Sequence, residues 1–278
     1  MISIVLPVYN ASETVLSTLM SVKNQNVTNV NVELIIVNDG SIDDSEILIK
    51  EFILENPHMD ITYIYKENSG VSGSRNLGIS KAKYDWVAFI DSDDVWSNNK
   101  LSEQVHVINS SEFNIDFIGC ARNDETLSLF GKEIINLHKA CYKELLIKMF
   151  PQTSTAMVKK SVLDSVGGYD ETMTHSEDGD LWIRICFEYD FYYMPVSLVV
   201  TGGNKHNFGE SGLSANLLAM EKGVQYTIFN LFKNKRISGS FYVFLRFFCF
   251  AKYIRRLLIS FYNRRAKASL KGISDDKL

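Results

Sequence analysis

Three carboxylates stand within four positions at the end of an apolar run. The run Trp86–Ile90 predicts a buried strand, and Asp91, Asp93 and Asp94 follow it directly. Because like charges at this spacing repel one another, a cation between them would stabilise the cluster. Mg²⁺ and Mn²⁺ prefer oxygen ligands and, when held by one or two carboxylates, also bind substrate phosphates. For the triplet alone, a solvated acidic turn in which an Asp caps the next helix is the plainer interpretation.

The first hundred residues alternate strand-like and helix-like segments. Four apolar runs predict strands over Ile2–Leu6, Glu33–Val37, Ile61–Tyr65 and Trp86–Ile90. Helical spacing lies between them, over Ser12–Asn24, Asp43–Glu55 and Val71–Lys81. This alternation predicts an α/β fold whose mostly parallel sheet is covered by helices on both faces. Ligands of such sheets bind at the carboxyl ends of the strands, which is where Pro7–Asn10, Asn38–Ser41 and Asp91–Asp94 fall.

The composition of the 278-residue chain is that of an ordinary globular protein. With 46% hydrophobic and 22% charged residues, it can form one large domain or two small ones. Its four cysteines have no paired spacing, which favours a reducing compartment over a zinc site or a disulfide framework. Met1 leads directly into an apolar run without a basic leader or a cleavage site, so we expect no secretory signal.

The charge of the chain is divided unevenly. Residues 222–278 carry 13 basic and 2 acidic side chains, whereas residues 1–221 carry 16 basic and 31 acidic ones. Eleven aromatic residues between 228 and 263 are interleaved with these cations. The longest uncharged run in the core of this tail, Ile237–Leu245, has nine residues, whereas a spanning helix needs roughly 20. The tail therefore predicts a helix that lies on an anionic membrane surface.

The tail also has alternatives to a membrane. Its cations could simply be solvated on a pair of packed helices, or the tail could pair subunits in a homo-oligomer. Nucleic acid is disfavoured as a partner, because the acidic bulk of the chain would repel it.

Further motifs accompany the acidic cluster. A loop of small residues, Asn68–Gly78, opens a helix, and its backbone amides and the cation of Arg75 suit an anion. Gly167–Glu171 indicates a turn, and Glu177–Asp178 begins another helix. Finally, Lys205–His206 lies in a loop rich in Gly and Asn.

Taken in order, these segments resemble the family 2 glycosyltransferases, inverting enzymes of the GT-A fold that use nucleotide-sugar donors. The resemblance covers roughly residues 1–210 and is carried by Leu6–Asn10, Val37–Ser41, Asn68–Gly78, Asp91–Asp94, Gly168–Glu171 and Glu177–Asp178. We therefore expect a catalytic domain over 1–221, with a nucleotide-binding part at 1–94 and an acceptor part at 95–221. A basic, aromatic and helical tail at 222–278 would follow and associate with a membrane.

The resemblance implies a donor site built from several loops. Asp39 would accept a hydrogen bond from the nucleotide base, and Asp91 would contact the ribose or the water shell of a metal. Two alternatives stay open, because Asp39 could be only a turn and cap residue and Arg75 could form a structural ion pair with a strand-end carboxylate. The expected donor-binding residues are Pro7, Tyr9, Asn10, Asp39, Asn68, Arg75 and Asp91.

The resemblance also implies a metal and a base. Asp93 would ligate Mn²⁺ or Mg²⁺ bridging to the donor diphosphate, and His206 would be a second ligand or a phosphate contact, although the segment after it departs from the family pattern. Asp178 would be the general base that deprotonates the acceptor hydroxyl, with Glu177 as its rival. Direct displacement at the anomeric carbon then predicts inversion without a covalent intermediate. We expect Asp94 to cap the following helix.

The expected function is transfer of a sugar from a nucleotide-diphosphate donor, with a UDP-sugar favoured, to a hydroxyl of a glycan acceptor. The acceptor would be lipid-linked, in bacterial surface polysaccharide synthesis, and the enzyme cytoplasmic and peripheral at the inner face of the plasma membrane. A sugar-phosphate nucleotidyltransferase should carry a Gly-rich loop with Arg and Lys after the first strand, which Pro7–Asn10 lacks. A non-catalytic nucleotide-sugar-binding scaffold would have no use for clustered, mutually repelling acids.

Overall fold

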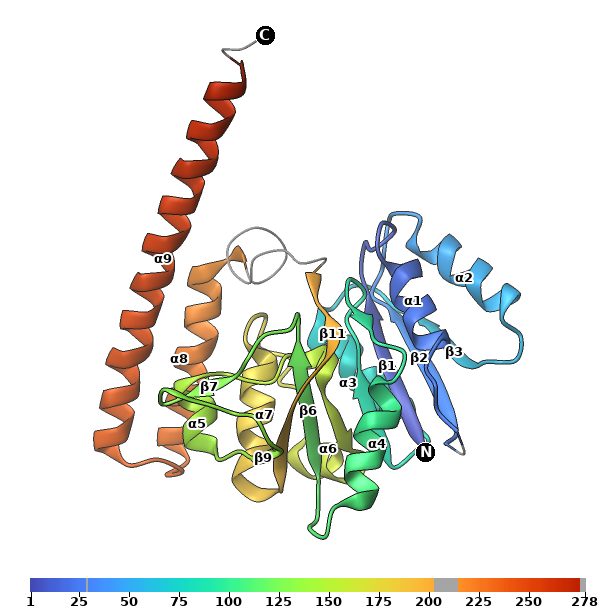
Figure 1. Cartoon of the computed structure of the whole chain (residues 1–278), viewed down its shortest axis with the longest axis horizontal. Coiled ribbons are helices and arrows are strands. Elements are labelled where there is room, and N and C mark those ends of the chain that lie inside the picture. Colours follow the sequence, from blue (N-terminus) through green and yellow to red (C-terminus); the bar gives the residue numbers. More distant parts are fainter. Residues whose placement is uncertain (29, 203–214, 276–278) are drawn as a thin grey trace. The chain divides into compact units, whose positions relative to one another are not determined.

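The computed structural model describes residues 1–28, 30–202 and 215–275, with side chains as far as Tyr262 (Figure 1). Two compact units make up the chain: Met1–Thr172 with Glu177–Asn204, and Met173–Ser176 with Lys205–Leu278. The domain boundary expected between residues 221 and 222 falls inside helix α8 (Leu217–Lys233). The expected nucleotide-binding and acceptor parts, which meet at residue 94, both lie largely in the first unit.

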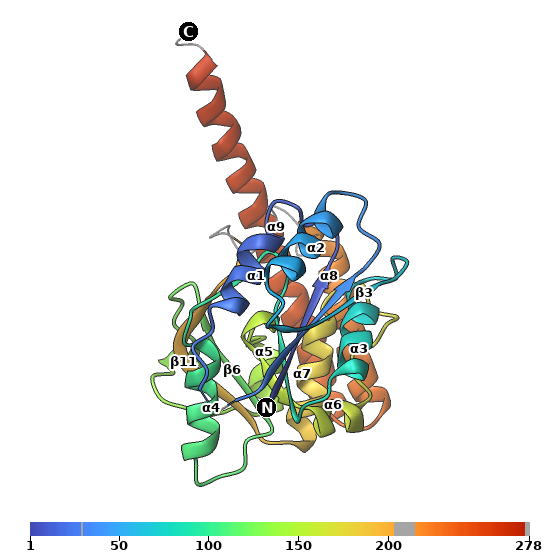
Figure 2. The same ribbon diagram turned by 90° about the vertical axis from the view of Figure 1, so that its right-hand side faces the viewer.

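The first half of the nine-stranded sheet in the first unit is parallel. Its order is β3-β2-β1-β4, with β1 at Ile2–Val8, β2 at Val32–Asn38, β3 at Asp60–Tyr65 and β4 at Trp86–Phe89. The connecting helices are α1 (Val15–Lys23), α2 (Ser45–Glu55) and α3 (Val71–Lys81). Helices α1 and α2 contact each other, and Figure 2 shows β1 between α1 and α3, so helices cover both faces.

The second half of the sheet is mixed. β10 (Met157–Lys159) is antiparallel to both β4 and β6 (Phe117–Arg122), and β6 is parallel to β11 (Phe191–Val200). The short strands β5 (Val95–Trp96) and β9 (His138–Lys139) pair with β11. The other elements of this half are α4 (Lys100–Ser110), the hairpin β7 (Ser128–Leu129) and β8 (Lys132–Glu133), α5 (Tyr142–Ile147), the 3₁₀ turn Thr153–Thr155, α6 (Lys160–Val166) and α7 (Glu177–Glu188). The expected fold, a mostly parallel sheet flanked by helices, is confirmed.

Strand β11 begins earlier than the sequence indicates. The sequence is strand-like only near Ser197–Thr201. A proline cannot donate to a sheet ladder, and Pro195 precedes this run. In the structure the pairing of β11 with β6 shifts register between Met194 and Ser197, which takes Pro195 out of the ladder. The strand therefore continues through the proline.

Strand β1 is the centre of the core, and all seven of its residues are buried. It reads as a continuous apolar run because it has strands on both sides and helices on both faces. Helix α3 lies very close to it: a Cβ added at Gly78 would come within 2.4 Å of Val5 Cγ1. A side chain at Gly78 would therefore push α3, and with it Arg75, away from the sheet.

The second unit contains α8 and the long helix α9 (Gly239–Asp275), which pack against each other (Figure 1). Leu245 and Cys249, one turn apart on α9, are buried. Glu221 of α8 interacts electrostatically with Cys249 and Arg256, so these residues mark the side of α9 that faces α8. Within the described part of the chain, no helix combines the length and the apolar character needed to cross a bilayer.

Candidate active site

The loop after β1 is hydrogen-bonded to the loop after β2. The backbone N–H of Asn10 donates to Ser41 Oγ at 3.0 Å, and the N–H of Ile42 donates to Asn10 Oδ1 at 2.9 Å. Tyr9 and Asn10 are exposed at this edge of the sheet, whereas Pro7 is buried inside β1. Of the three residues expected to line the base and ribose pocket, two therefore present their side chains at the surface.

The carboxylate of Asp39 holds the loop that follows β3. Its two oxygens accept hydrogen bonds from the backbone amides of Ser69 at 3.0 Å and Gly70 at 2.9 Å, and Lys66 Nζ forms an ion pair with it. Asn68 lies exposed in the same loop. Because a carboxylate offers about four lone-pair sites, these three donors leave room for one more. The position of Asp39 is thus compatible with both the turn role and the base-binding role.

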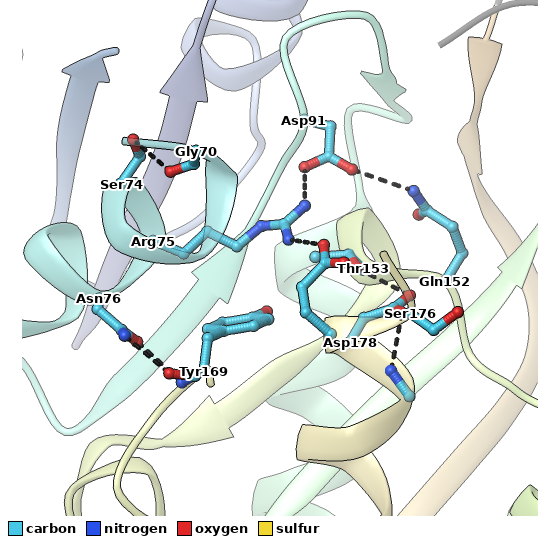
Figure 3. A network of polar contacts seen from close by, with 12 residues as sticks. Gly70, Ser74, Arg75, Asn76, Asp91, Gln152, Thr153, Tyr169, Ser176 and Asp178 are labelled. Atoms are coloured by element: carbon cyan, nitrogen blue, oxygen red, sulfur yellow. Dashed lines mark hydrogen bonds and ion pairs between the residues drawn. The ribbon is translucent and has the colours of Figure 1, made fainter. Parts of the chain in front are cut away.

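Arg75 is buried on α3 between two carboxylates that come from distant parts of the chain (Figure 3). Its Nη2 lies 2.7 Å from Asp91 Oδ1, and its Nη1 lies 2.8 Å from Glu177 Oε1. The ring of Tyr169 lies 5.1 Å from the guanidinium carbon. Burial alone would lower the pKa of Arg75, but the neighbouring carboxylates raise it well above its usual value. The alternative of an ion pair with a strand-end carboxylate is confirmed by the contact with Asp91.

Asp94 does not cap the following helix, contrary to our expectation. Helix α4 begins at Lys100 with Asn99 as its N-cap, whereas Asp94 is buried behind the acidic cluster. Its carboxylate accepts hydrogen bonds from Ser154 Oγ at 2.5 Å, Gln152 Nε2 at 3.0 Å and the backbone N–H of Gly202 at 2.9 Å. The prediction failed because the chain turns into β5 after Asp94, so five residues separate it from the helix start.

The acidic cluster brings the buried carboxylate of Asp94 close to Asp91 and Asp93. Burial, and then the charges of Asp91 and Asp93, raise the pKa of Asp94 to about 7. Asp93 is exposed at the surface, and Asp91 is only partly covered, with Oδ2 3.4 Å from Gln152 Nε2. Carboxylate oxygens grouped at the end of a strand suit a divalent cation that also binds substrate phosphates. His206 lies outside the described residues.

Among those described residues, no three His, Cys, Asp or Glu side chains are grouped closely enough to hold a metal ion by themselves.

Asp178 is the second residue of α7 and differs from its neighbour Glu177. It accepts a hydrogen bond from its following amide, Gly179 N, at 2.7 Å and a long one from Thr153 Oγ1 at 3.4 Å (Figure 3). Burial, and then the charge of Glu177, raise the pKa of Asp178 to about 6, although Arg75 opposes the shift. Because Glu177 is engaged by Arg75, Asp178 is the carboxylate of this pair that is better suited to accept a proton near neutral pH.

The 3₁₀ turn at Thr153–Thr155 was missed as part of the site. Besides binding Asp94, Ser154 Oγ accepts from the N–H of Asp91 at 2.9 Å, and Thr153 reaches Asp178. The only signal in the sequence was the polar run at residues 152–155. Trp182 of α7 is fully buried and donates to the carbonyl of Pro151 at 3.2 Å, as a packing residue does.

Comparison with known proteins gives relatives that are named as glycosyltransferases. An uncharacterized glycosyltransferase of Rickettsia bellii is 31% identical over 188 residues, covering 66% of this chain and 26% of that protein. The UDP-Glc:alpha-D-GlcNAc-diphosphoundecaprenol beta-1,3-glucosyltransferase WfgD of Escherichia coli is 28% identical over 217 residues, covering 78% of this chain and 80% of that protein. The chain spans 26%, 58% and 58% of the lengths of three Rickettsia relatives, one of them the R. bellii protein.

Two solved structures share the fold. S. aureus TarS 1-349 in complex with UDP-GlcNAc aligns with a TM-score of 0.65 at 15% identity, over 92% of this chain and 72% of that one. The mannosyltransferase PcManGT of Pyrobaculum calidifontis, in complex with GDP-Man and Mn²⁺, aligns with a TM-score of 0.68 at 14% identity, over 98% and 79%. The expected GT-A fold is therefore confirmed.

Two family models match the chain itself. Glycosyltransferase like family 2 matches residues 125–241, and Glycosyl transferase family 2 matches residues 3–167, which include the loops after β1, β2 and β4 and the turn at Thr153–Thr155. The chain belongs to glycosyl transferase family 2.

Proposed function

We propose that this protein is an inverting glycosyltransferase that moves a sugar from a UDP-sugar to a hydroxyl of a lipid-linked glycan in the synthesis of a bacterial surface polysaccharide. The name of WfgD, a relative covered over most of its length, describes a UDP-glucose donor and a diphosphoundecaprenol-linked acceptor. A second relative, GgaB of Bacillus subtilis, is named as a minor teichoic acid biosynthesis protein. Both names favour a polymer of the cell surface.

One observation carries the catalytic part of the proposal: Arg75 engages Glu177 and Asp91 and so leaves Asp178 as the base. Asp178 would accept the proton of the acceptor hydroxyl while the acceptor oxygen bonds to the anomeric carbon. The bond from that carbon to the diphosphate breaks on the opposite face, so the configuration inverts. A base whose pKa lies at about 6 is mostly deprotonated at neutral pH and still accepts a proton readily.

The donor would lie along the carboxyl ends of β1, β2 and β4. Asp39 would accept from the nucleotide base with its remaining lone pair, and Pro7, Tyr9 and Asn10 would border the base and ribose. Asn68 would contact the donor from the loop that Asp39 holds, while Arg75 and Asp91 would act together from the other side. In this arrangement Arg75 orients Asp91 toward the ribose or toward the metal's water shell.

Mn²⁺ or Mg²⁺ would be held by Asp93 and the donor diphosphate, with His206 as a further ligand or phosphate contact. When bound, such an ion neutralises the negative charge that develops on the departing diphosphate. The grouping of Asp91, Asp93 and Asp94 within four positions supports this assignment, and the structurally similar mannosyltransferase contains Mn²⁺.

A lipid-linked acceptor would place the enzyme in the cytoplasm at the inner face of the plasma membrane. The basic tail beyond residue 221 would then contact anionic lipid, and the catalytic domain would remain in the aqueous phase.

Acceptor-dependent release of nucleotide tests the proposal. Purified protein with Mn²⁺ or Mg²⁺ would be supplied with UDP-, GDP- and dTDP-sugars and a short-chain lipid diphosphate that carries GlcNAc. We expect UDP release only when donor and acceptor are both present, and a product whose new linkage, read by NMR, is opposite in configuration to the donor. UDP release that does not depend on the acceptor, or a product of retained configuration, would refute it.

A further inference from the structure

Helix α9 carries an exposed apolar stripe, which we define as Val243, Phe247, Phe250, Ile254 and Leu258. Their exposed fractions are 51%, 74%, 55%, 39% and 54%. Spacings of three and four residues place these side chains on one face of the helix. At 1.5 Å per residue, the stripe extends over about 22 Å. Soluble proteins rarely expose an apolar surface of this length unless it meets a partner.

The stripe is not the face that packs on α8. Leu245, Cys249 and Arg256 mark that side, since the first two are buried and the last two interact with Glu221 of α8. Leu245 and Phe247 are separated by 200° around the helix axis, at 100° per residue. The intramolecular packing of the hairpin therefore leaves the stripe side of α9 exposed.

Charge determines which partner fits the stripe. Arg246 and Arg255 are exposed and lie on its two borders. Between residues 215 and 274 the sequence contains twelve Lys and Arg residues but only one acid, Glu221, which is buried. A second copy seated on this face would bring arginines against arginines without an acid to pair them. Anionic lipid headgroups supply the missing charge, and the acyl boundary supplies an apolar phase.

We propose that the α9 stripe is inserted into the interface of an anionic bilayer, with the helix axis parallel to the membrane surface. The hydrophobic side chains would lie below the headgroups, and Arg246 and Arg255 would reach the phosphates from either border. This inference deepens the proposed function by naming the surface that meets the membrane. It rests on that function only in one respect: a lipid-linked acceptor is the reason for the enzyme to bind a membrane.

Binding to vesicles tests the stripe with a matched pair of variants. The triple variant Phe247→Ser, Ile254→Ser and Leu258→Ser removes one residue of each type from the stripe. The control, Phe130→Ser, Ile135→Ser and Leu54→Ser, removes the same three types from exposed positions of the first unit. With vesicles that contain phosphatidylglycerol, we expect the stripe variant to bind at least about tenfold more weakly and the control to bind as the wild type does.

A fluorescence probe keeps the test independent of the stability of the triple variant. Helix α9 contains no tryptophan, so Phe247→Trp reports on the stripe and Phe130→Trp serves as its control. We expect lipids brominated in the acyl chain to quench Phe247→Trp more strongly than Phe130→Trp. Equal quenching, or equal vesicle binding by the stripe and control triples, would overturn the proposal.

Two further readouts separate this inference from its alternatives. If the stripe joins two copies, light scattering would show a dimer for the wild type and the control and a monomer for the stripe variant. The wild type would then not bind vesicles, and that result also overturns the proposal. Transfer to a water-soluble acceptor should be the same in the stripe variant and the wild type. If the wild type binds vesicles but has no transferase activity, and the stripe variant loses vesicle binding, the proposal for the stripe is supported and the proposed function is refuted.

Discussion

Arg75 and Glu177 lie 102 positions apart in the sequence and are joined by a hydrogen bond of 2.8 Å between Nη1 and Oε1. The contact fastens the start of α7 to α3, which itself lies against β1. It also distinguishes two adjacent acids, because Glu177 forms an ion pair with Arg75, whereas Asp178 interacts with that cation only through its charge. In the proposed mechanism, the choice of Asp178 as the base would therefore follow from how α3 and α7 pack.

We predict that Arg75→Met is strongly destabilising. It leaves Glu177 buried and Asp91 partly buried without their cation, and removal of one partner from a buried pair typically costs about 3–5 kcal/mol. Urea unfolding followed by circular dichroism measures the change. Lys160→Met is the matched control, since its partner Asp164 is exposed and surface pairs contribute at most about 1 kcal/mol. Equal losses in the two variants would show that the Arg75 network has no special role.

Replacing the base should separate catalysis from donor binding. Asp178→Asn is expected to lower the transfer rate by a factor of ~10² or more, because loss of a positioned general base has effects of this size. UDP binding, measured by calorimetry, should change little. Asp164→Asn, an exposed acid on α6, is the control and should retain full activity. A wild-type transfer rate in Asp178→Asn would exclude this residue as the base.

The same variant should be no less stable than the wild type. The pKa of Asp178 is raised in the folded protein, so folding takes up a proton between about pH 4 and 6, and the stability contributed by this group decreases as the pH rises through that window. At pH 8 the buried charge opposes folding, and Asp178→Asn removes it. We expect the Tm of the variant at pH 8 to equal or exceed that of the wild type; a lower Tm would mean that the carboxylate stabilises the fold.

Activity should depend on pH through the base. A general base acts when deprotonated, so with Asp178 in that proposed role kcat/KM should increase as the pH rises through about 6 and level off above about 7. Below pH 6 the slope of log kcat/KM should approach one per pH unit. A profile measured at constant ionic strength from pH 5 to 8 checks this, and a flat profile across that range would contradict it.

Metal dependence should pass through Asp93. Chelation with EDTA is expected to abolish transfer, and Mn²⁺ or Mg²⁺ should restore it. Together with UDP, Mn²⁺ should raise the Tm of the wild type, because a ligand that binds only the folded state stabilises it by mass action. Asp93→Asn should remove most of that increase, whereas Asp44→Asn, an acid at the start of α2, should keep it. Full stabilisation of Asp93→Asn by Mn²⁺ and UDP would place the ion elsewhere.

Local patterns in the sequence were sufficient for the architecture and for most of the candidate acids. Continuous apolar runs predict buried parallel strands, and the carboxyl ends of such strands lie at one edge of the sheet. Periodicity alone therefore predicts that Asp39 and Asp91 lie at one site. The order of the motifs was enough to indicate the family. Each of these inferences depends on residues that are neighbours along the chain.

Tertiary packing decided the partners of those acids. The sequence left Arg75 between two roles, indicated Asp178 as the base with Glu177 as its rival, and suggested a cap role for Asp94. The structure pairs Arg75 with two carboxylates, buries Asp94 against Ser154 and thereby brings the turn at Thr153–Thr155 into the site. Propensity and periodicity act over a few residues, whereas charge pairing and burial depend on which distant segments the fold brings within hydrogen-bonding distance, and only the packed structure specifies that.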